Sequence, residues 1–421
     1  MNKPHKQMPA SAVHKWKTRL AKLAVYAWLV VIGLILLEAG VRIWLWHLAD
    51  GEAFLHYASG HYLKKRDDPN YPILRQSPAR YLGYYPKPNY SYHGNNHNAL
   101  GFRGSEIVLP KPEGEFRIAC LGGSTTYCSN IDSSDMTYPA ALERALQHRG
   151  YKATVINAGN EAWTSYESLI NYALRVSYLD VDMILVYHGI NDLLARIVWP
   201  PQAYKSDNSG FRATAGSKHD LPTFLDFCLS LRVPLIAANI LGTDMTLFRT
   251  YDIVAPTWHA LDWWQMHYGG KPGIFADVSL QQILQDNPPV YFERNLEHLV
   301  ALASADGVHT LFVTFVHQHD YPEQPLVSAE AIQGGYQEMN QVVRQVAKKT
   351  GASLCDAAAV FPHDTEYFVE GEGIHFSQTG ADIHAGIIAH CICQSELIPD
   401  HFRTLPVSSD STPQPCSTPS R

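Results

Sequence analysis

Short apolar runs alternate with amphipathic segments along much of this chain, and that alternation restricts the fold more than any other feature of the sequence. Alternating strands and helices build a parallel sheet that is covered by helices on both faces. We therefore expect an α/β fold, a three-layer α/β/α sandwich around a central parallel sheet. The expected strands are 116–121, 153–157, 182–188, 310–315 and 353–356, and the expected helices are 138–149, 165–178, 296–305, 329–349 and 377–393.

The most hydrophobic segment lies near the N-terminus, from Leu23 to Trp46. At ~1.5 Å per residue a helix over this segment is about 36 Å long, enough to cross a bilayer core with some tilt. Six Lys and Arg residues and no acidic residue precede it. The sequence therefore predicts one transmembrane helix with a cytoplasmic N-terminus, so that the remainder lies outside the cytoplasm.

A cleaved signal peptide and a buried helix of a soluble protein are the two alternatives for this segment. The leader before the apolar run is long for a signal peptide, and no A-x-A-like cleavage site follows the run. We favour a retained single-pass anchor in the inner (plasma) membrane, with the catalytic domain periplasmic or extracytoplasmic.

Changes in composition along the chain suggest its boundaries. A Tyr- and Pro-rich connector without regular structure is expected before the sheet, and a Ser-, Thr- and Pro-rich disordered tail after it. The expected parts are a cytoplasmic basic leader (1–22), the transmembrane helix (23–46), the connector (47–115), the α/β domain (116–400) with an insertion at about 198–289, and the tail (401–421).

Charge and cysteine content exclude several classes of protein. The net charge is −7, which gives no reason to expect nucleic acid as a partner. The seven cysteines are odd in number and irregularly spaced, so that neither a disulfide scaffold nor a zinc ribbon is indicated. We expect ordinary buried thiols.

Polar or glycine-containing turns follow the predicted strands and precede the last helix. Ligands of open parallel sheets bind at the carboxyl ends of the strands, so these turns are expected to meet at one rim. Each turn alone is most simply a turn or a helix start. The four segments are Leu121-Gly-Gly-Ser-Thr-Thr126, Asn157-Ala-Gly-Asn160, His188-Gly-Ile-Asn-Asp192 and Glu372-Gly-Ile-His-Phe-Ser377.

In this order and position, the four segments resemble the sequence blocks of the SGNH/GDSL hydrolase superfamily. Gly-Gly-Ser stands where the family usually has Gly-Asp-Ser, and Glu372 stands where it usually has Asp. The resemblance covers about residues 116–398 and implies the flavodoxin-like fold of these hydrolases. The matching positions are Gly123-Ser124, Gly159, Gly189-x-Asn191-Asp192 and Glu372-x-x-His375.

The resemblance implies a catalytic triad. Ser124 would be the nucleophile, because a hydroxyl needs an adjacent base to attack a carbonyl carbon at neutral pH. His375 would be that base, and Glu372 would orient the imidazole and stabilise its cation. Glu370, two residues earlier, is the alternative for the third role.

The resemblance also implies an oxyanion hole formed by the backbone N–H groups of Ser124 and Gly159 and by the side chain of Asn191. Asp192 is expected to be a capping or turn residue beside the site. His188 precedes the same block, and we expect it to be structural.

A metal site at Val316-His317-Gln318-His319-Asp320 is the rival hypothesis, because two His residues two apart in a strand point the same way. No third ligand follows from the spacing. We therefore expect neither a metal nor another cofactor.

The leading functional hypothesis is a membrane-anchored extracytoplasmic serine esterase that cleaves O-acyl esters, in particular O-acetyl esters on carbohydrate. Its partners would be an ester-bearing small molecule or an O-acylated polysaccharide, and a lipid bilayer at residues 23–46. One alternative is an O-acyltransferase that modifies a surface polysaccharide, and another is a non-catalytic envelope binding or scaffold protein. The segment Asn98-Ala-Leu-Gly-Phe-Arg-Gly104 resembles the anchored, envelope-facing bacterial members.

An aromatic cluster in the insertion has two interpretations. It could form a stacking face for sugars, but hydrophobic packing within the insertion is the simpler reading. The cluster comprises Trp258, Trp263, Trp264 and Tyr268.

Overall fold

The computed structural model divides into two units, Met1–Asp68 with Leu221–Phe248 and Pro69–Asp220 with Arg249–Arg421. The tail beyond residue 403, most of the insertion and its aromatic cluster lie outside the described residues. The structure describes residues 10–48, 75–79, 81–199, 201, 204–208, 259–260, 278–320 and 329–403.

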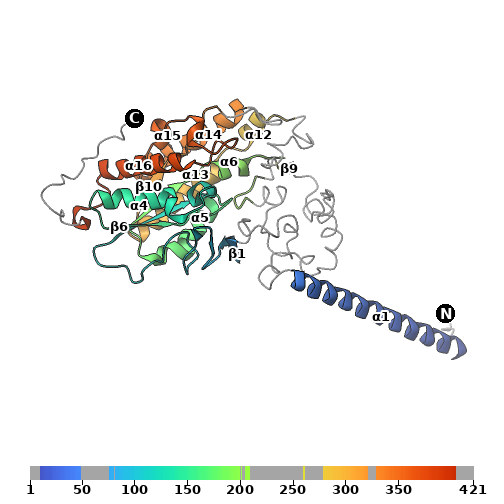
Figure 1. The fold of residues 1–421 in the computed structure, drawn as a ribbon. Helices are drawn as coiled ribbons and strands as arrows, with labels where there is room; N and C mark the ends of the chain where they lie inside the picture. The colour runs from blue at the N-terminus through green and yellow to red at the C-terminus, as the bar shows by residue number, and fades with distance from the viewer. Residues whose placement is uncertain are drawn as a thin grey trace, which may run out of the picture. The chain divides into compact units, whose positions relative to one another are not determined.

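The first unit contributes one described element, helix α1 (Ala10–Leu48, blue in Figure 1). Within α1, Trp16–Gly40 is long and apolar enough to cross a membrane. This span begins and ends earlier than the predicted Leu23–Trp46, although α1 contains both. A signal sequence meets the same criteria of length and composition.

The second unit is built around a parallel sheet, as predicted. Its strand order is β11-β10-β7-β5-β6, and every neighbouring pair is parallel. In chain order this is the flavodoxin-like arrangement 2-1-3-4-5, in which the order reverses between β5 and β7. The strands are β5 (Phe116–Gly122), β6 (Ala153–Asn157), β7 (Met183–Tyr187), β10 (His309–Val313) and β11 (Ser353–Cys355), each close to a predicted strand.

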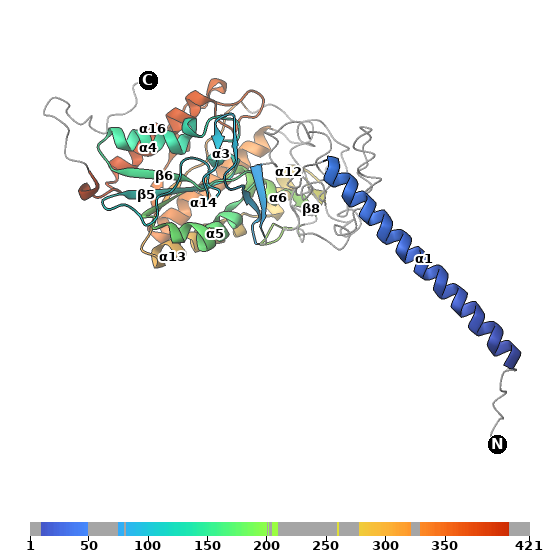
Figure 2. The ribbon, with the colours of Figure 1, turned by 60° about the horizontal axis from the view of Figure 1, so that its bottom comes forward.

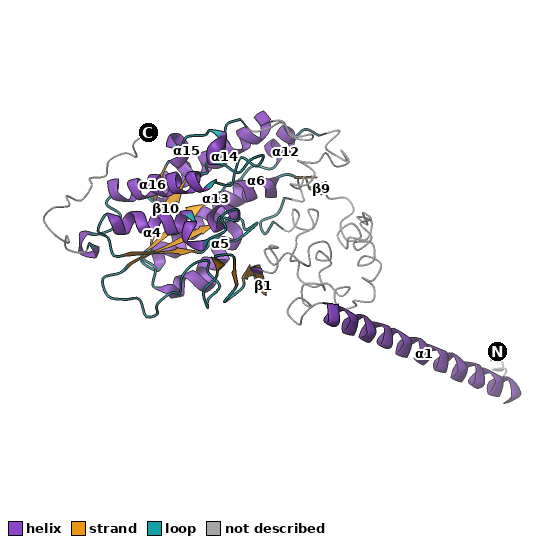
Figure 3. Ribbon diagram, viewed as in Figure 1, coloured by secondary structure: helices purple, strands orange, loops and turns teal. Residues whose placement is uncertain are grey.

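Helices cover both faces of this sheet and complete the predicted sandwich (Figures 2 and 3). Helices α4 and α16 pack on each other on one face, and α13 packs against α5 and α14 on the other. The sheet is therefore buried on both sides, which explains its continuous apolar strands. The helices are α4 (Tyr138–His148), α5 (Ser165–Asn171), α13 (Val290–Ala305), α14 (Ala329–Thr350) and α16 (Gln378–Gln394).

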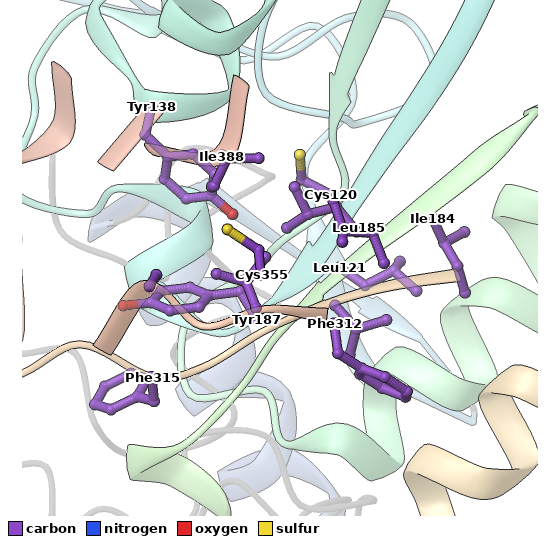
Figure 4. Packing of buried hydrophobic residues seen from close by; sticks show 14 of the residues in the cluster. Cys120, Leu121, Tyr138, Ile184, Leu185, Tyr187, Phe312, Phe315, Cys355 and Ile388 are labelled. Atoms are coloured by element: carbon purple, nitrogen blue, oxygen red, sulfur yellow. The ribbon is translucent and has the colours of Figure 1, made fainter. Parts of the chain in front are cut away.

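Side chains of the strands and of both helical layers form one continuous core. Figure 4 shows Tyr138 of α4 and Ile388 of α16 beside Cys120 of β5, and Phe312 of β10 near Ile184 of β7. All five are 0% exposed. Full burial of a large apolar side chain contributes roughly 1.5–3 kcal/mol, so this core is the main stabilising element of the unit.

The expected helix over 165–178 ends earlier as an α-helix. Helix α5 begins with a capping box. The Thr164 side chain accepts a hydrogen bond from the backbone N–H of Tyr166, and the Glu167 carboxylate accepts one from the backbone N–H of Thr164. From Tyr172 to Val176 the hydrogen bonds change to the π pattern, and Ser177–Leu179 form a 3₁₀ turn. The periodicity of apolar residues does not distinguish α, π and 3₁₀ hydrogen bonding, because a helix of each of these three kinds presents one buried face.

Several shorter elements were not predicted. Two antiparallel pairs, β1 with β2 and β3 with β4, lie in the segment that was expected to lack regular structure. The shorter elements are β1 (Gln76–Ala79), β2 (Gly83–Pro86), β3 (Ser91–Tyr92), β4 (Asn95–Asn96), α3 (Ser124–Tyr127), α6 (Ile190–Arg196), β8 (Val198–Trp199), β9 (His259–Ala260), α12 (Leu280–Asp286) and α15 (Ala357–Val360).

A disulfide joins Cys355 of β11 to Cys391 of α16, 36 residues later, with an S–S distance of 2.06 Å. The expectation of free thiols is therefore wrong for these two residues. It is confirmed for Cys120, Cys128 and Cys393, which are free and buried. Irregular spacing in sequence did not reveal that an edge strand and the last helix bring two cysteines together. Closing a loop of this length stabilises a fold by about 2–4 kcal/mol.

Candidate active site

The nucleophile candidate lies directly after the central strand β5. The strand ends at Gly122, and Ser124 is the first residue of the four-residue helix α3. A Cβ atom at Gly123 would lie 2.4 Å from Asn191 Nδ2 and 2.9 Å from the Trp163 carbonyl oxygen. Glycine is therefore required at position 123, where the family usually has Asp, because the neighbouring side chain leaves no room for a Cβ.

Ser124, His375 and Glu372 form a continuous chain of hydrogen bonds. Ser124 Oγ lies 2.9 Å from His375 Nε2, and His375 Nδ1 lies 2.5 Å from Glu372 Oε2. The side chains of His375 and Glu372 are 17% and 32% exposed, so that a substrate can reach the serine and histidine. Of the two candidate carboxylates, Glu372 faces His375, whereas Glu370 lines a neighbouring hollow.

Backbone hydrogen bonds hold the loop that carries the histidine and its carboxylate. Val369 N–H donates to the carbonyl of His375 at 2.8 Å, and Gln318 N–H donates to that of Gly373 at 2.9 Å. Immediately afterwards Ser377 caps α16 by accepting a hydrogen bond from Gly380 N–H. The imidazole is therefore presented from a loop fixed at both ends.

Asn191 is positioned beside the nucleophile turn by the first turn of α6, which follows β7. Its Nδ2 donates to the Trp163 carbonyl at 2.8 Å. The loop that supplies this carbonyl turns through Ala162, whose φ of 55° is unusual for a residue other than glycine. Asn191 therefore presents an amide donor next to Gly123, and its role as an oxyanion-binding side chain stays a prediction.

Gly159, the predicted second backbone donor, lies on the loop after β6. Its N–H donates to Asn157 Oδ1 at 3.2 Å. A Cβ at this position would lie 2.7 Å from Thr126 Cβ and from the Tyr127 nitrogen. Glycine therefore allows the β6 loop to pack closely under α3, and the role of Gly159 as an oxyanion donor stays a prediction.

Asp192 and His188 belong to a buried network behind the site. The Asp192 carboxylate accepts hydrogen bonds from Ser165 N–H and Ser165 Oγ at the start of α5. Asp192 thus caps a neighbouring helix, while His188 Nε2 lies 2.7 Å from Ser168 Oγ. Burial raises the pKa of Asp192 to about 7 and lowers that of His188 to about 3, so that His188 is neutral.

Cys128 is a potential competing nucleophile on the loop after α3. It is buried, and this burial raises the pKa of its thiol to about 11. The thiolate is the nucleophilic form of cysteine, so that Cys128 remains an unreactive thiol at neutral pH. The serine is the better-placed nucleophile.

The histidines proposed as a rival metal site do not lie in a strand, because β10 ends at Val313. The His319 ring stacks on His363 at 3.7 Å, and both ring nitrogens of His363 face carbonyl oxygens. Within the described part of the chain, no group of three or more His, Cys, Asp or Glu residues could hold a metal ion.

Asn130 is a site residue that sequence reasoning missed. Its Nδ2 donates to Glu372 Oε2 at 3.0 Å, the same oxygen that faces His375. The two residues are 242 positions apart, and Asn130 belongs to none of the four motif segments. No local pattern could have identified it.

Fold and site together define an α/β protein with a Ser-His-carboxylate arrangement at the carboxyl ends of its strands. The model of the GDSL-like lipase/acylhydrolase family matches residues 120–383, more than half of the chain. The chain belongs to this family, and the protein is accordingly a hydrolase of ester bonds.

Several solved structures are similar to this chain. A lipase/acylhydrolase from Enterococcus faecalis is 15% identical, with a TM-score of 0.36, over 66% of this chain and 95% of its own. A GDSL-like lipase from Bacteroides thetaiotaomicron is 13% identical, with a TM-score of 0.37, over 68% and 93%. An acetyl xylan esterase is 11% identical, with a TM-score of 0.37, over 67% and 100%. No curated protein matches the chain significantly.

Replacing Gly123 by Ala is expected to lower kcat about 10–100-fold, because misplacing a catalytic group by ~1 Å can cost that much. The new Cβ would displace the Asn191 amide, whereas the extended backbone at Gly123 (φ −87°) accepts alanine. Steady-state kinetics with an acetyl ester would measure the change. Gly334→Ala is the control, because no atom lies within 4 Å of a Cβ there. Unchanged kcat in Gly123→Ala would contradict the steric argument.

Proposed function

We propose that this protein is a membrane-anchored, extracytoplasmic serine esterase that removes O-acetyl groups from carbohydrate. The observation that carries the proposal is the chain of hydrogen bonds from Ser124 through His375 to Glu372. This arrangement has the connectivity that acyl transfer to a serine requires.

In the first half-reaction His375 Nε2 accepts the proton of Ser124 as Oγ attacks the ester carbonyl. Glu372 holds the Nδ1–H tautomer and stabilises the imidazolium that forms. The negative charge on the carbonyl oxygen is stabilised by the Ser124 N–H and the Asn191 amide. The imidazolium then protonates the leaving alcohol, and water attacks the acyl-enzyme by the reverse proton path.

A small hollow beside the triad supports a short acyl group. It has a volume of about 10 Å³ and is lined by residues that include Thr125, Cys128, Ile131 and His375. Such a volume is at the lower limit for one water-sized group, so that the methyl of an acetyl ester is nearer to it in size than a longer alkyl chain.

A larger hollow next to the catalytic loop supports a carbohydrate as the carrier. Its volume is about 540 Å³. Amide, hydroxyl and carboxylate groups can bond sugar hydroxyls, and the ring of Phe368 can stack on a sugar face. It is lined by Gln318, Asp320, Thr365, Glu366, Phe368, Glu370 and Gly371. Its three carboxylates favour an uncharged saccharide over a polyanion.

Two observations support the location. The apolar span Trp16–Gly40 is preceded by basic residues, which favour a cytoplasmic N-terminus. The disulfide Cys355–Cys391 is of the kind that persists in oxidising compartments outside the cytoplasm.

Hydrolysis of p-nitrophenyl esters by the full-length protein in detergent tests the proposal. We expect turnover of the acetate at least about tenfold above that of the octanoate, because the acyl hollow admits roughly one water-sized group. A fluorophosphonate should label Ser124 stoichiometrically, as located by peptide mass spectrometry.

A preference for octanoate would contradict the short acyl pocket, and labelling of another serine would contradict the nucleophile assignment. Transfer to a sugar hydroxyl shares the same first half-reaction. If acetylated oligosaccharide forms without release of free acetate, the protein is an O-acyltransferase and not an esterase.

A further inference from the structure

Arg103 is almost completely buried, being 3% exposed, and among the described residues its guanidinium forms hydrogen bonds to carbonyl and hydroxyl oxygens and to no carboxylate. Instead, Nη1 donates to the carbonyls of Tyr127 and Cys128 at 2.9 and 2.7 Å. Nη2 donates to those of Ile131 and Asp132 at 2.5 and 3.0 Å. One side chain thus binds four carbonyls of a single loop, residues 127–132.

This loop connects the nucleophile helix to the rest of the chain. Helix α3 ends at Tyr127, and Cys128 follows in the left-handed conformation with φ 62°. The end of a helix leaves carbonyl groups without intrahelical partners, and Arg103 supplies donors and a positive charge there. Nε, 3.4 Å from Ser134 Oγ, completes the contacts of the guanidinium.

The same loop reaches the other end of the triad through Asn130. Its Nδ2 donates to Glu372 Oε2, the oxygen that pairs with His375. Glu372 is partly exposed, at 32%, so that its rotamer is not fixed by burial alone. A donor on a rigid loop restricts that rotamer, whereas a donor on a mobile loop does not.

We propose that Arg103 is a positioning residue for the triad, which fixes the 127–132 loop so that Asn130 holds Glu372 in line with His375. This inference rests on the proposed function, and it gives the Asn98–Gly104 segment a role that the four motif blocks do not include. Lysine cannot replace the arginine, because an ammonium has three donors and lacks the planar fork that serves two pairs of carbonyls.

A double-mutant cycle on kcat for p-nitrophenyl acetate tests the inference in the full-length protein. We expect Asn130→Ala and Arg103→Lys each to lower kcat about tenfold, the effect of losing roughly one hydrogen bond to a charged group. Because Asn130 also lines the small acyl hollow, KM is measured beside kcat, and a rise in KM at constant kcat would show a binding role in place of a positioning role. If Arg103 acts through Asn130, the double variant should have the kcat of either single variant.

Arg117→Lys is the matched control. Arg117 of β5 is 1% exposed and donates to carbonyls of Leu179 and Val108, but it pairs with Glu115, just before the strand. We expect Arg117→Lys to lower the melting temperature without changing kcat per fluorophosphonate-labelled site. If the role of Arg103 were merely structural, Arg103→Lys would likewise lower the melting temperature without changing kcat per labelled site.

Several outcomes would overturn the inference. Independent, multiplicative effects of Arg103→Lys and Asn130→Ala would show that the arginine does not act through Asn130. Unchanged kcat in Asn130→Ala, a surface variant that should fold normally, would be decisive even if Arg103→Lys does not fold. Wild-type protein without esterase activity would instead refute the proposed function, and the inference with it.

Discussion

The Ser124→Ala variant is expected to lose ester hydrolysis almost completely, with kcat lower by about 10⁴–10⁶-fold, as for other triad serines. Without Oγ no acyl-enzyme can form, and His375 Nε2 loses the proton donor 2.9 Å away. The measurement is steady-state turnover of p-nitrophenyl acetate by full-length variants. Combining Ser124→Ala with His375→Ala should lower kcat no further, because the two residues act as one unit.

Ser304→Ala is the matched control for this experiment. Ser304 is exposed near the end of α13 and lines neither hollow. Its replacement should leave kcat unchanged. Activity retained in Ser124→Ala, or lost in Ser304→Ala, would contradict the assignment of the nucleophile.

Asn191→Ala is expected to lower kcat by about 10²–10³-fold while KM stays nearly constant. The Asn191 amide lies beside the Ser124 turn, where the carbonyl oxygen gains charge only as the tetrahedral species forms. A donor that acts on that charge contributes to the transition state more than to substrate binding. Kinetics at saturating and at low acetyl ester separate the two parameters.

The control is Asn287→Ala, another asparagine whose amide donates to backbone carbonyls. The Asn287 amide donates to the carbonyls of Arg196, the last residue of α6, and of Val198. Loss of this side chain should lower stability and leave kcat unchanged. A rise in KM with constant kcat in Asn191→Ala would show that Asn191 binds substrate and does not stabilise the oxyanion.

The sequence predicted the sheet because its strands are buried on both faces. Phe116–Leu121 and 153–157 are short apolar runs, and each lies within one residue of an observed strand. Helix α6 was not predicted because its seven residues are too few for a reliable period. The π-turn from Tyr172 depends on hydrogen-bond partners, which residue identity does not specify.

The candidate site was partly predictable because its motif segments lie next to the ends of predicted strands and helices. Serine, histidine and Glu372 stand in motif segments at the ends of elements, and the i,i+3 spacing lets Glu372 reach His375. The sequence does not show that Asn157 Oδ1 accepts a hydrogen bond from the Gly159 N–H. Asn130 was missed because only the tertiary fold brings it to Glu372.

The disulfide has a consequence for how the enzyme would tolerate proteolysis. His375 lies between Cys355 and Cys391 in the sequence. A single backbone cleavage between the two cysteines would therefore leave both fragments covalently joined through sulfur. The fragment that carries the end of α16 would stay attached to β11 and to the N-terminal part of the chain, so that a nicked molecule keeps all its parts for reassembly.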